Sequence, residues 1–257
     1  MKISVVTTTF NSEKTVADTI ESVLAQTHKD IEYIVVDGAS KDSTMDIVKK
    51  YESAFEGKIK YVSERDTGIY NAMNKGLQMA TGDVVGTLNS DDFFADNSVL
   101  ETINNAFETS NTDCVFANLL LVDAKDTNKV IREFCNGEYR KNAFQKGWHP
   151  AHPTFYAKTE LYKKFGYFNE TLRIAADFEL MLRFIEKNKI TTKYIDKVFV
   201  KQRAGGVSTQ LSGYIKSNIE VLKAFKLNGM RVPLLCVPRK ILPKLINGIS
   251  HKISRTK

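Results

Sequence analysis

Two adjacent carboxylates, Asp91 and Asp92, close the apolar run "GDVVGTLN" and are followed at once by Phe93 and Phe94. Carboxylate oxygens are the ligands that a hard cation such as Mg²⁺ prefers, and diphosphate oxygens can fill its remaining positions. The same pair could instead end a strand and cap the next element, as Asp often does. The choice between these interpretations depends on which residues lie beside the pair in the fold.

Three other predicted strands end in polar residues. Short β-branched runs at 3–9, 31–37, 58–64 and 82–89 alternate with helical patterns, which predicts a mainly parallel sheet with helices on both faces. The carboxyl ends of such strands meet at one edge, where ligands bind. The residues at these ends are Thr7, Thr8, Thr9, Phe10 and Asn11; Asp37, Gly38, Ala39 and Ser40; Glu64, Arg65, Asp66 and Gly68; and Asn89, Ser90, Asp91 and Asp92.

The usual glycine-rich phosphate motifs are absent from the chain. Neither G-x-x-x-x-G-K-[ST] nor G-x-G-x-x-G occurs in the sequence. Phosphate charge at the strand ends would therefore need another partner, and a cation held by Asp91 and Asp92 is the one that the residues offer.

The second half of the chain is less regular. Its pattern predicts strands at 113–123, 128–134 and 193–203, with helices at 158–166, 175–188 and 211–227. Without a Gly/Ser linker or an internal repeat, residues 1–220 are expected to form one α/β domain with two functional halves, 1–92 and 93–220.

Residues 221–257 differ from this domain in charge. They hold nine Lys or Arg residues and no acid, which leaves 28 of the 37 basic residues against all 30 acidic residues in 1–220. We therefore expect a near-neutral body that binds no nucleic acid, and a basic amphipathic tail. The tail could lie on an anionic membrane or pack on the domain. Its apolar residues at helical spacing are Leu242, Leu245, Ile246, Ile249 and Ile253.

Composition sets the remaining bounds. Hydrophobic residues make up 42% of the chain, no apolar run approaches the ~20 residues of a membrane span, and the first ten residues lack the pattern of a signal peptide. Three widely spaced cysteines argue against a disulfide framework or a zinc site. These features predict a cytoplasmic protein.

Several motifs in fixed order resemble glycosyltransferase family 2, whose members have the nucleotide-sugar-binding GT-A fold. "SVVTTTFN" resembles the family's opening strand, with Thr8 in the common proline slot. "TIESVLAQTHKDIEYIVVDGASKDST" is similar to the next helix and the D-D-G-S-x-D-x-T loop, and "DTGIYNAMNKGLQMATGDVVGTLNSDD" resembles the segment that ends in D-x-D. The resemblance covers about residues 3–210 and implies a Rossmann-like GT-A domain.

The resemblance also implies roles for individual residues. Gly38 and Asn89 depart from the family pattern, since each stands where an Asp is usual. Asp91 is therefore the expected direct ligand of Mg²⁺ or Mn²⁺, with Asp92 second. The expected nucleoside contacts are Thr8, Asn11 and Asp37, and the expected donor contacts are Arg65, Asp66, Gly68, Lys75 and Asp92.

A sugar transferase also needs a base, because a neutral hydroxyl is a poor nucleophile. "RIAADFELMLRF" resembles the family's E-D-x-x-L-x-x-R segment, with Asp177 in the Asp slot and Ala176 in the Glu slot. Asp177 is the predicted base, although it could serve only as a helix cap. Glu179 is an alternative that should point elsewhere.

Two further segments hold candidate substrate contacts. "KGWHPAHPTFY" contains Trp148, which could stack on a sugar, and His149 and His152, which the resemblance places on the acceptor side. These histidines fit no standard zinc spacing and could be structural. Arg203, before two glycines, is expected to reach the leaving diphosphate.

The sequence thus predicts an inverting, metal-dependent glycosyltransferase. Residues 1–92 would bind a nucleotide-diphosphate sugar, with a UDP-sugar as the first expectation, and residues 93–220 a saccharide or lipid-linked saccharide of the cell envelope. The expected location is the inner face of the cell membrane. Two alternatives stay open: a nucleotidyltransferase acting on sugar phosphates, which should carry a basic Gly-rich loop, and a non-catalytic saccharide-binding module, which would not need the metal carboxylates.

Overall fold

Four parallel strands form the first half of the sheet in the computed structural model, which describes residues 1–205 and 211–233. β1 (Ile3–Thr9) lies between β2 (Ile31–Asp37) and β4 (Val84–Thr87), and β3 (Ile59–Ser63) pairs with the outer side of β2. Thr9 is level with Asp37, and Asp37 with Ser63. The predicted convergence of these strand ends at one edge is confirmed.

The second half of the sheet is mixed. β8 (Tyr156–Lys158) runs antiparallel between β4 and β6 (Cys114–Val122), whereas β9 (Thr192–Arg203) runs parallel to β6. β5 (Phe93–Phe94) pairs with β9, and β7 (Val130–Phe134) with β6. The strand order is β3-β2-β1-β4-β8-β6-β9-β5, with β7 beside β6. This arrangement brings the end of β9 next to the residues that follow β4.

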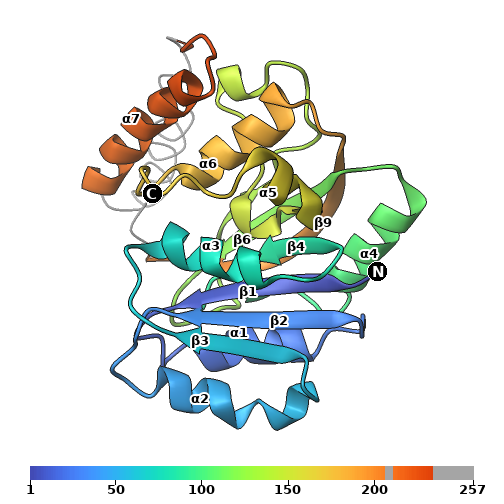
Figure 1. Cartoon of the computed structure of the whole chain (residues 1–257), viewed down its shortest axis with the longest axis vertical. Coiled ribbons are helices and arrows are strands. Elements are labelled where there is room, and N and C mark those ends of the chain that lie inside the picture. The colour runs from blue at the N-terminus through green and yellow to red at the C-terminus, as the bar shows by residue number, and fades with distance from the viewer. Residues whose placement is uncertain (206–210, 234–257) are drawn as a thin grey trace, which may run out of the picture.

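Helices cover both faces of the sheet, as the alternating pattern predicts (Figure 1). Along β1, Val5 packs with one hydrophobic cluster and Val6 with the other, since successive side chains of a strand point to opposite faces. The cluster around Val5 takes in α1 (Val16–Leu24), α2 (Thr44–Lys50) and α4 (Val99–Thr109). The cluster around Val6 takes in α3 (Ile69–Met79), α5 (Thr159–Phe165), α6 (Ala176–Met181) and α7 (Leu211–Leu227).

The helix α3 lies unusually close to the sheet. A Cβ atom at Gly76 would stand 2.3 Å from Cγ1 of Val6, so glycine is required for this approach. The contact fixes α3 directly above β1, and α3 begins where the loop after β3 ends. The first turn of α3 is thereby held at the edge where the strand ends meet.

The boundary expected at residue 220 falls inside α7. Val221, Ala224 and Phe225 are at most 1% exposed and belong to the core, so 221–227 is part of the folded domain and not of a separate tail. The rest of the predicted basic tail, 234–257, lies outside the described residues. Within the described residues, no helix is long and apolar enough to cross a bilayer.

Candidate active site

The loop after β4 presents its two carboxylates differently. Asp91 is partly exposed, whereas Asp92 is fully buried. The Asp92 carboxylate accepts hydrogen bonds from Nδ2 of Asn89 at 3.1 Å, from Nε2 of Gln202 at 3.3 Å and from the backbone N–H of Arg203 at 3.3 Å. Asp92 therefore ties the loop to β9, and Asp91 is the carboxylate that a ligand can reach.

The electrostatics of this pair are unbalanced. Burial, and then the neighbouring Asp91, raise the pKa of Asp92 to about 8. Burial also raises the pKa of Asp91, although the charge of Arg203 opposes the rise. Two neighbouring carboxylates, one of them buried among neutral donors, are more stable when a cation lies beside them.

The donor atoms of the loop fit a divalent cation bound together with a diphosphate. Oδ1 of Asn89 is buried and has no hydrogen-bond partner, and the Asp91 carboxylate lies two residues away in the same turn. Both are oxygen ligands of the kind that Mg²⁺ and Mn²⁺ accept. No group of three or more His, Cys, Asp or Glu residues is placed to hold a metal within the described part of the chain. The protein would thus supply part of the coordination shell and the diphosphate the rest.

Arg203 supports the loop from the end of β9. Its Nη1 donates to the carbonyl oxygen of Asp91 at 2.7 Å, its Nη2 pairs with Asp18 of α1, and its side chain is 9% exposed. The guanidinium also stacks 4.8 Å from the ring centroid of Phe93. For Arg203 to make the predicted contact with the leaving diphosphate, its ion pair with Asp18 would have to break.

The predicted nucleoside contacts lie at the ends of β1 and β2 and are linked to one another. Asp37 is fully buried and accepts hydrogen bonds from the hydroxyls of Ser40 and Ser63, the latter at 2.6 Å. Oδ1 of Asn11 accepts from the backbone N–H of Lys41 at 2.9 Å. Asp37 and Asn11 thus shape the two loops, and Thr8, 7% exposed, lies on β1 behind them.

One side chain at this edge was missed as a site residue although it stands in the strand-end motif. Phe10 is 62% exposed, the most exposed of the large hydrophobic side chains that stand out on the described surface. A Cβ at Gly38 would lie 3.3 Å from its ring. Gly38, where an Asp is usual, therefore leaves the Phe10 ring close to the backbone with a face open to solvent. An aromatic residue directly after a β-branched run was the available signal.

The predicted donor contacts after β3 form a charged loop. Nζ of Lys75 on α3 pairs with Asp66 and with Glu64, both at 2.6 Å, while Arg65 between them is exposed. Gly68 has a φ of 151°, a conformation that favours glycine. Lys75 holds the loop in shape, and Arg65 is the cation of this loop that is left at the surface.

Asp177 stands in the first turn of α6 and is connected to this loop. The hydroxyl of Tyr70, in the first turn of α3, donates to the backbone oxygen of Ile174 at 2.8 Å and lies 3.3 Å from Oδ1 of Asp177. Burial, and then the charge of Asp177, raise the pKa of the Tyr70 hydroxyl well above its ordinary value. Tyr70 therefore stays protonated and donates to Asp177, which is partly exposed.

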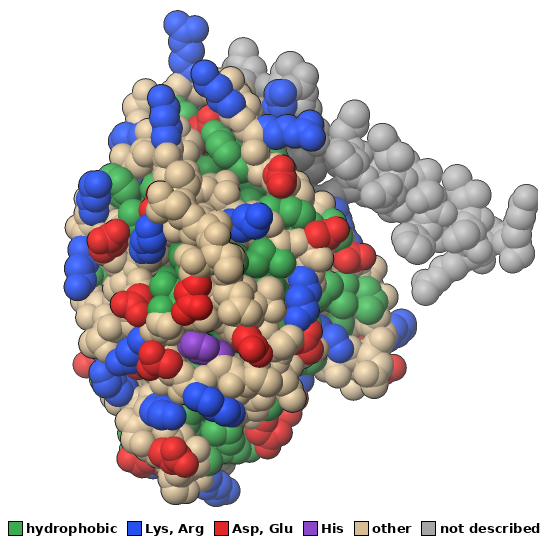
Figure 2. All heavy atoms as spheres, turned by 90° about the vertical axis from the view of Figure 1, so that its right-hand side faces the viewer, with side chains coloured by type: hydrophobic (Ala, Val, Ile, Leu, Met, Phe, Trp, Pro, Cys, Tyr) green, Lys and Arg blue, Asp and Glu red, His purple; other side chains and the backbone are tan. Residues whose placement is uncertain are grey.

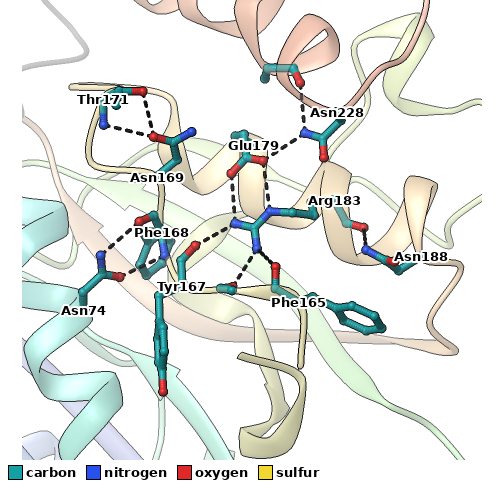
Figure 3. A network of polar contacts seen from close by, with 12 residues as sticks. Asn74, Phe165, Tyr167, Phe168, Asn169, Thr171, Glu179, Arg183, Asn188 and Asn228 are labelled. Atoms are coloured by element: carbon teal, nitrogen blue, oxygen red, sulfur yellow. Dashed lines mark hydrogen bonds and ion pairs between the residues drawn. The ribbon is translucent and has the colours of Figure 1, made fainter. Parts of the chain in front are cut away.

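Glu179, the alternative base, has a different environment, shown in Figure 3. It is 3% exposed, pairs with Arg183 at 3.0 Å and accepts a hydrogen bond from Asn228 at 2.9 Å. Arg183 also donates to the backbone oxygens of Phe165, Gly166 and Tyr167. Glu179 is a buried structural carboxylate, which leaves Asp177 as the base candidate of this segment.

Two residues that sequence reasoning missed hold the segment before Asp177. Oε2 of Glu220 on α7 accepts hydrogen bonds from the backbone N–H groups of Arg173, Ile174 and Ala175 at 2.8–3.1 Å. Nη1 of Arg173 donates to the backbone oxygen of Thr67 at 2.6 Å, beside Gly68. These contacts join residues 47 and 106 positions apart, which no local pattern could reveal.

The predicted acceptor residues occupy two environments. Trp148 packs in an aromatic cluster with Phe116, Phe144 and Tyr139, and its indole N–H donates to Asn136. His149 packs against Phe178 of α6. These two partly buried side chains line the region next to α6.

His152 lies at the end of β4. Its Nε2 is 2.9 Å from the hydroxyl of Thr87, at the end of β4, and its ring packs on Phe168. Burial lowers the pKa of His152, and the charge of Asp177 opposes that shift. His152 thus connects the end of β4 with the region of Asp177.

Known proteins with similar sequences are glycosyltransferases. An uncharacterized glycosyltransferase of Nostoc sp. is 36% identical over 126 residues, which are 49% of this chain and 39% of that protein. The chain therefore spans less than half the length of this relative. A PGL/p-HBAD biosynthesis glycosyltransferase of Mycobacterium bovis is 25% identical over 257 residues, 95% of this chain and 92% of the relative.

Solved structures share the fold. S. aureus TarS 1–349 in complex with UDP-GlcNAc matches with a TM-score of 0.69 and 22% identity, over 93% of this chain and 69% of that one. The mannosyltransferase PcManGT from Pyrobaculum calidifontis, in complex with GDP-Man and Mn²⁺, matches with a TM-score of 0.67 and 17% identity, over 93% and 68%. The family model named Glycosyl transferase family 2 matches residues 4–166, and the chain is a member of that family with the GT-A fold.

Proposed function

We propose that this chain transfers a sugar from a nucleotide-diphosphate sugar, with a UDP-sugar as the first donor to test, to a hydroxyl of a saccharide acceptor in cell-envelope polysaccharide synthesis. Family membership supports the transferase activity. A TarS structure holds UDP-GlcNAc, and the Mycobacterium bovis relative is named for PGL/p-HBAD biosynthesis. The observation that carries the proposal is the connection of the Asp177 segment to the loop after β3 through Tyr70 and Arg173.

In this proposal the strand ends bind the donor. The open face of Phe10 stacks on the nucleobase, and the loops shaped by Asn11 and Asp37 surround the nucleoside. Asp91 and Oδ1 of Asn89 would hold a Mg²⁺ or Mn²⁺ ion, which would neutralise the charge of the diphosphate. The Mn²⁺ in the PcManGT structure supports this metal requirement. Arg65 adds a cation from the neighbouring loop.

Asp177 acts as the general base. Its carboxylate takes the proton of the acceptor hydroxyl while that oxygen forms a bond to the anomeric carbon and the bond to the diphosphate breaks. A single displacement of this kind inverts the anomeric centre. Tyr70, through its hydrogen bond, fixes the rotamer of Asp177, and Glu220 and Arg173 fix the backbone beneath it.

The acceptor is proposed to lie over residues 93–220, and the donor over residues 1–92. Trp148, His149 and His152 are the proposed acceptor contacts. A lipid-linked saccharide at the inner face of the cell membrane is the proposed acceptor class. The proposed membrane contact of the basic tail falls on residues that the structure does not describe.

Donor binding and turnover test this proposal directly. Nucleotide sugars are screened with Mn²⁺, with Mg²⁺ and with EDTA, and the melting temperature and the release of nucleoside diphosphate are measured. A donor at about 100 times its Kd should stabilise the fold by about 2.7 kcal/mol, and only with the metal present. Asp91→Ala should remove this stabilisation.

Three outcomes would contradict the proposal. If the donor stabilises the fold equally in EDTA, donor binding does not require a metal. Release of pyrophosphate from a nucleoside triphosphate and a sugar phosphate would indicate a nucleotidyltransferase. Binding of a saccharide without consumption of any nucleotide sugar would indicate a non-catalytic module.

A further inference from the structure

The helix α7 carries an apolar surface that no described element covers. Ile215, Ile219 and Leu227 are 56%, 51% and 52% exposed, although the opposite side of the same helix is buried in the core. At about 100° per residue, Ile215, Ile219, Lys223 and Lys226 fall on one stripe along the helix. We call the exposed side chains Ile215, Lys216, Ile219, Lys223, Lys226 and Leu227 the outer arc of α7.

The outer arc combines aliphatic tips with positive charge only. Its three lysines are all exposed, and the one acid among the described residues of α7, Glu220, is engaged by the backbone N–H groups of 173–175. The chain beyond α7, through residue 257, has no acidic residue at all. The helix therefore offers cations and apolar groups to whatever approaches it.

The face of the molecule drawn in Figure 2 differs from the outer arc. Figure 2 shows the face on the right of Figure 1, where Lys and Arg side chains lie among Asp and Glu side chains over the middle and lower parts of the view. A mixed surface of that kind is ordinary for a protein that faces water. The segregation of charge on α7 thus calls for a partner of opposite charge that also accepts aliphatic side chains.

Charge complementarity selects an anionic bilayer among the possible partners. A second copy of this chain, related by a twofold axis, would set lysines against lysines. A nucleic acid would match the lysines but would leave the isoleucines without apolar contacts. The headgroup boundary of an anionic bilayer accepts both, because lysine amines reach lipid phosphates while the aliphatic tips enter the acyl region.

We propose that the outer arc of α7 docks this protein on an anionic lipid surface, with Ile215 and Ile219 in the headgroup boundary and the three lysines on lipid phosphates. The inner side of α7 holds the backbone that precedes Asp177, through Glu220. Docking would thereby bring the base side of the protein to the lipid surface. This last consequence rests on the proposed function, whereas the docking itself does not.

Vesicle sedimentation of the full chain tests the docking. The vesicles are phosphatidylcholine alone or phosphatidylcholine with about 30% phosphatidylglycerol. One variant carries Lys216→Gln, Lys223→Gln and Lys226→Gln, and a second carries Ile215→Gln and Ile219→Gln. The wild type should bind the anionic vesicles only, the lysine variant should bind about 100-fold more weakly, and the isoleucine variant at least about tenfold more weakly.

A matched control removes three exposed cations elsewhere. Lys125→Gln, Lys129→Gln and Arg132→Gln, on and beside β7, make the same change in net charge and should reduce binding by less than about threefold. Free glycerol phosphate at the concentration of lipid phosphate should not compete, since it offers no apolar boundary. Competition would mean that a free phosphate is the ligand, and would overturn the proposal that the outer arc docks on a bilayer.

Three further outcomes would overturn the proposal. The first is an equal loss of vesicle binding in the β7 control and the lysine variant, and the second is unchanged vesicle binding in both α7 variants. The third is a dimer in sedimentation velocity that the isoleucine variant abolishes while its vesicle binding persists. Asp177→Asn separates docking from catalysis. This variant should bind vesicles as tightly as the wild type does, so a failure of the proposed transfer would leave the docking result unaffected.

Discussion

The pair Asp91 and Asp92 and the pair Asp177 and Glu179 each contain one partly exposed and one buried carboxylate. The buried members differ in their partners. Glu179 meets the guanidinium of Arg183, whereas Asp92 meets only neutral donors and has a pKa raised to about 8. The buried carboxylate on α6 thus has a cationic partner, whereas the side chains that hydrogen-bond to the buried carboxylate after β4 are neutral. This difference supports the proposals that a cation binds after β4 and that Asp177 accepts a proton at α6.

The largest effect should come from the α6 pair. Asp177→Asn should lower kcat by about 10²- to 10⁴-fold, because the amide cannot accept the acceptor proton, while the melting temperature and donor Kd stay unchanged. Glu179→Gln should do the reverse and cost about 3 kcal/mol of stability, because the largely buried guanidinium of Arg183 loses its carboxylate partner and keeps only backbone oxygens. Steady-state kinetics and urea unfolding of both variants check this contrast.

The roles assigned to Asp177 and Glu179 would be wrong if the two variants showed each other's predicted effects. Full transfer by Asp177→Asn would exclude it as the base. A loss of kcat in folded Glu179→Gln, with stability intact, would show that its burial does not keep it from the chemistry.

The β4 pair should separate metal binding from loop structure. Asp91→Asn should weaken Mn²⁺-dependent donor binding by at least about tenfold with little change in melting temperature, since no other described residue donates a hydrogen bond to its carboxylate. Asp92→Asn should lower stability, because its new amide faces the donors Asn89 and Gln202. Calorimetric titration of donor with and without Mn²⁺ distinguishes the two. If both variants lost the same donor affinity and neither lost stability, the assignment of metal binding to Asp91 and loop structure to Asp92 would be wrong.

Much of the donor side could be predicted from sequence because it depends on local order. β-branched runs give β1 and β2 with the expected bounds, and parallel pairing then sets Thr9, Asp37 and Ser63 side by side. The exposure of Asp91 relative to Asp92 does not follow from sequence. It depends on Gln202 and Arg203, more than a hundred residues away.

The second half resisted prediction for the same physical reason. β5 and β8 have two and three residues, too few for a period to show, and they exist because β9, β4 and β6 supply hydrogen-bond partners. Glu220 looks like an ordinary acid on a helix until the fold brings the N–H groups of Arg173 to Ala175 to it. Patterns identify elements, and tertiary contacts decide which polar groups remain available.

The buried carboxylate of Glu32 shows how a cationic partner changes the pKa of a buried acid. Glu32 on β2 is 2% exposed, and although burial alone would raise its pKa, hydrogen bonds from Lys60, Ser4 and Thr81 lower it to about 2. The folded state thus favours ionised Glu32. Its contribution to stability is present above the ordinary pKa of 4.5 and is lost as the pH falls from there toward 2.

Replacement of Glu32 should remove this acid dependence. Glu32→Gln should cost about 2 kcal/mol at about pH 7 and should flatten the fall in unfolding free energy between pH 4.5 and 2, as followed by urea titration. Exposed Glu160→Gln is the control and should leave the curve unchanged. A variant curve as steep as that of the wild type would mean that Lys60 and its neighbours do not hold the charge.

The smallest effect should come from Glu220, which acts on Asp177 only through the backbone. Glu220→Gln should lower kcat about fivefold, the equivalent of about 1 kcal/mol, with donor KM unchanged. Glu220→Asp should restore part of kcat, and Lys223→Gln on the outer arc of the same helix should change neither quantity. A lower melting temperature with kcat unaltered would make Glu220 a residue of the fold alone, and the α6 pair would then owe its arrangement to Tyr70 and Arg173.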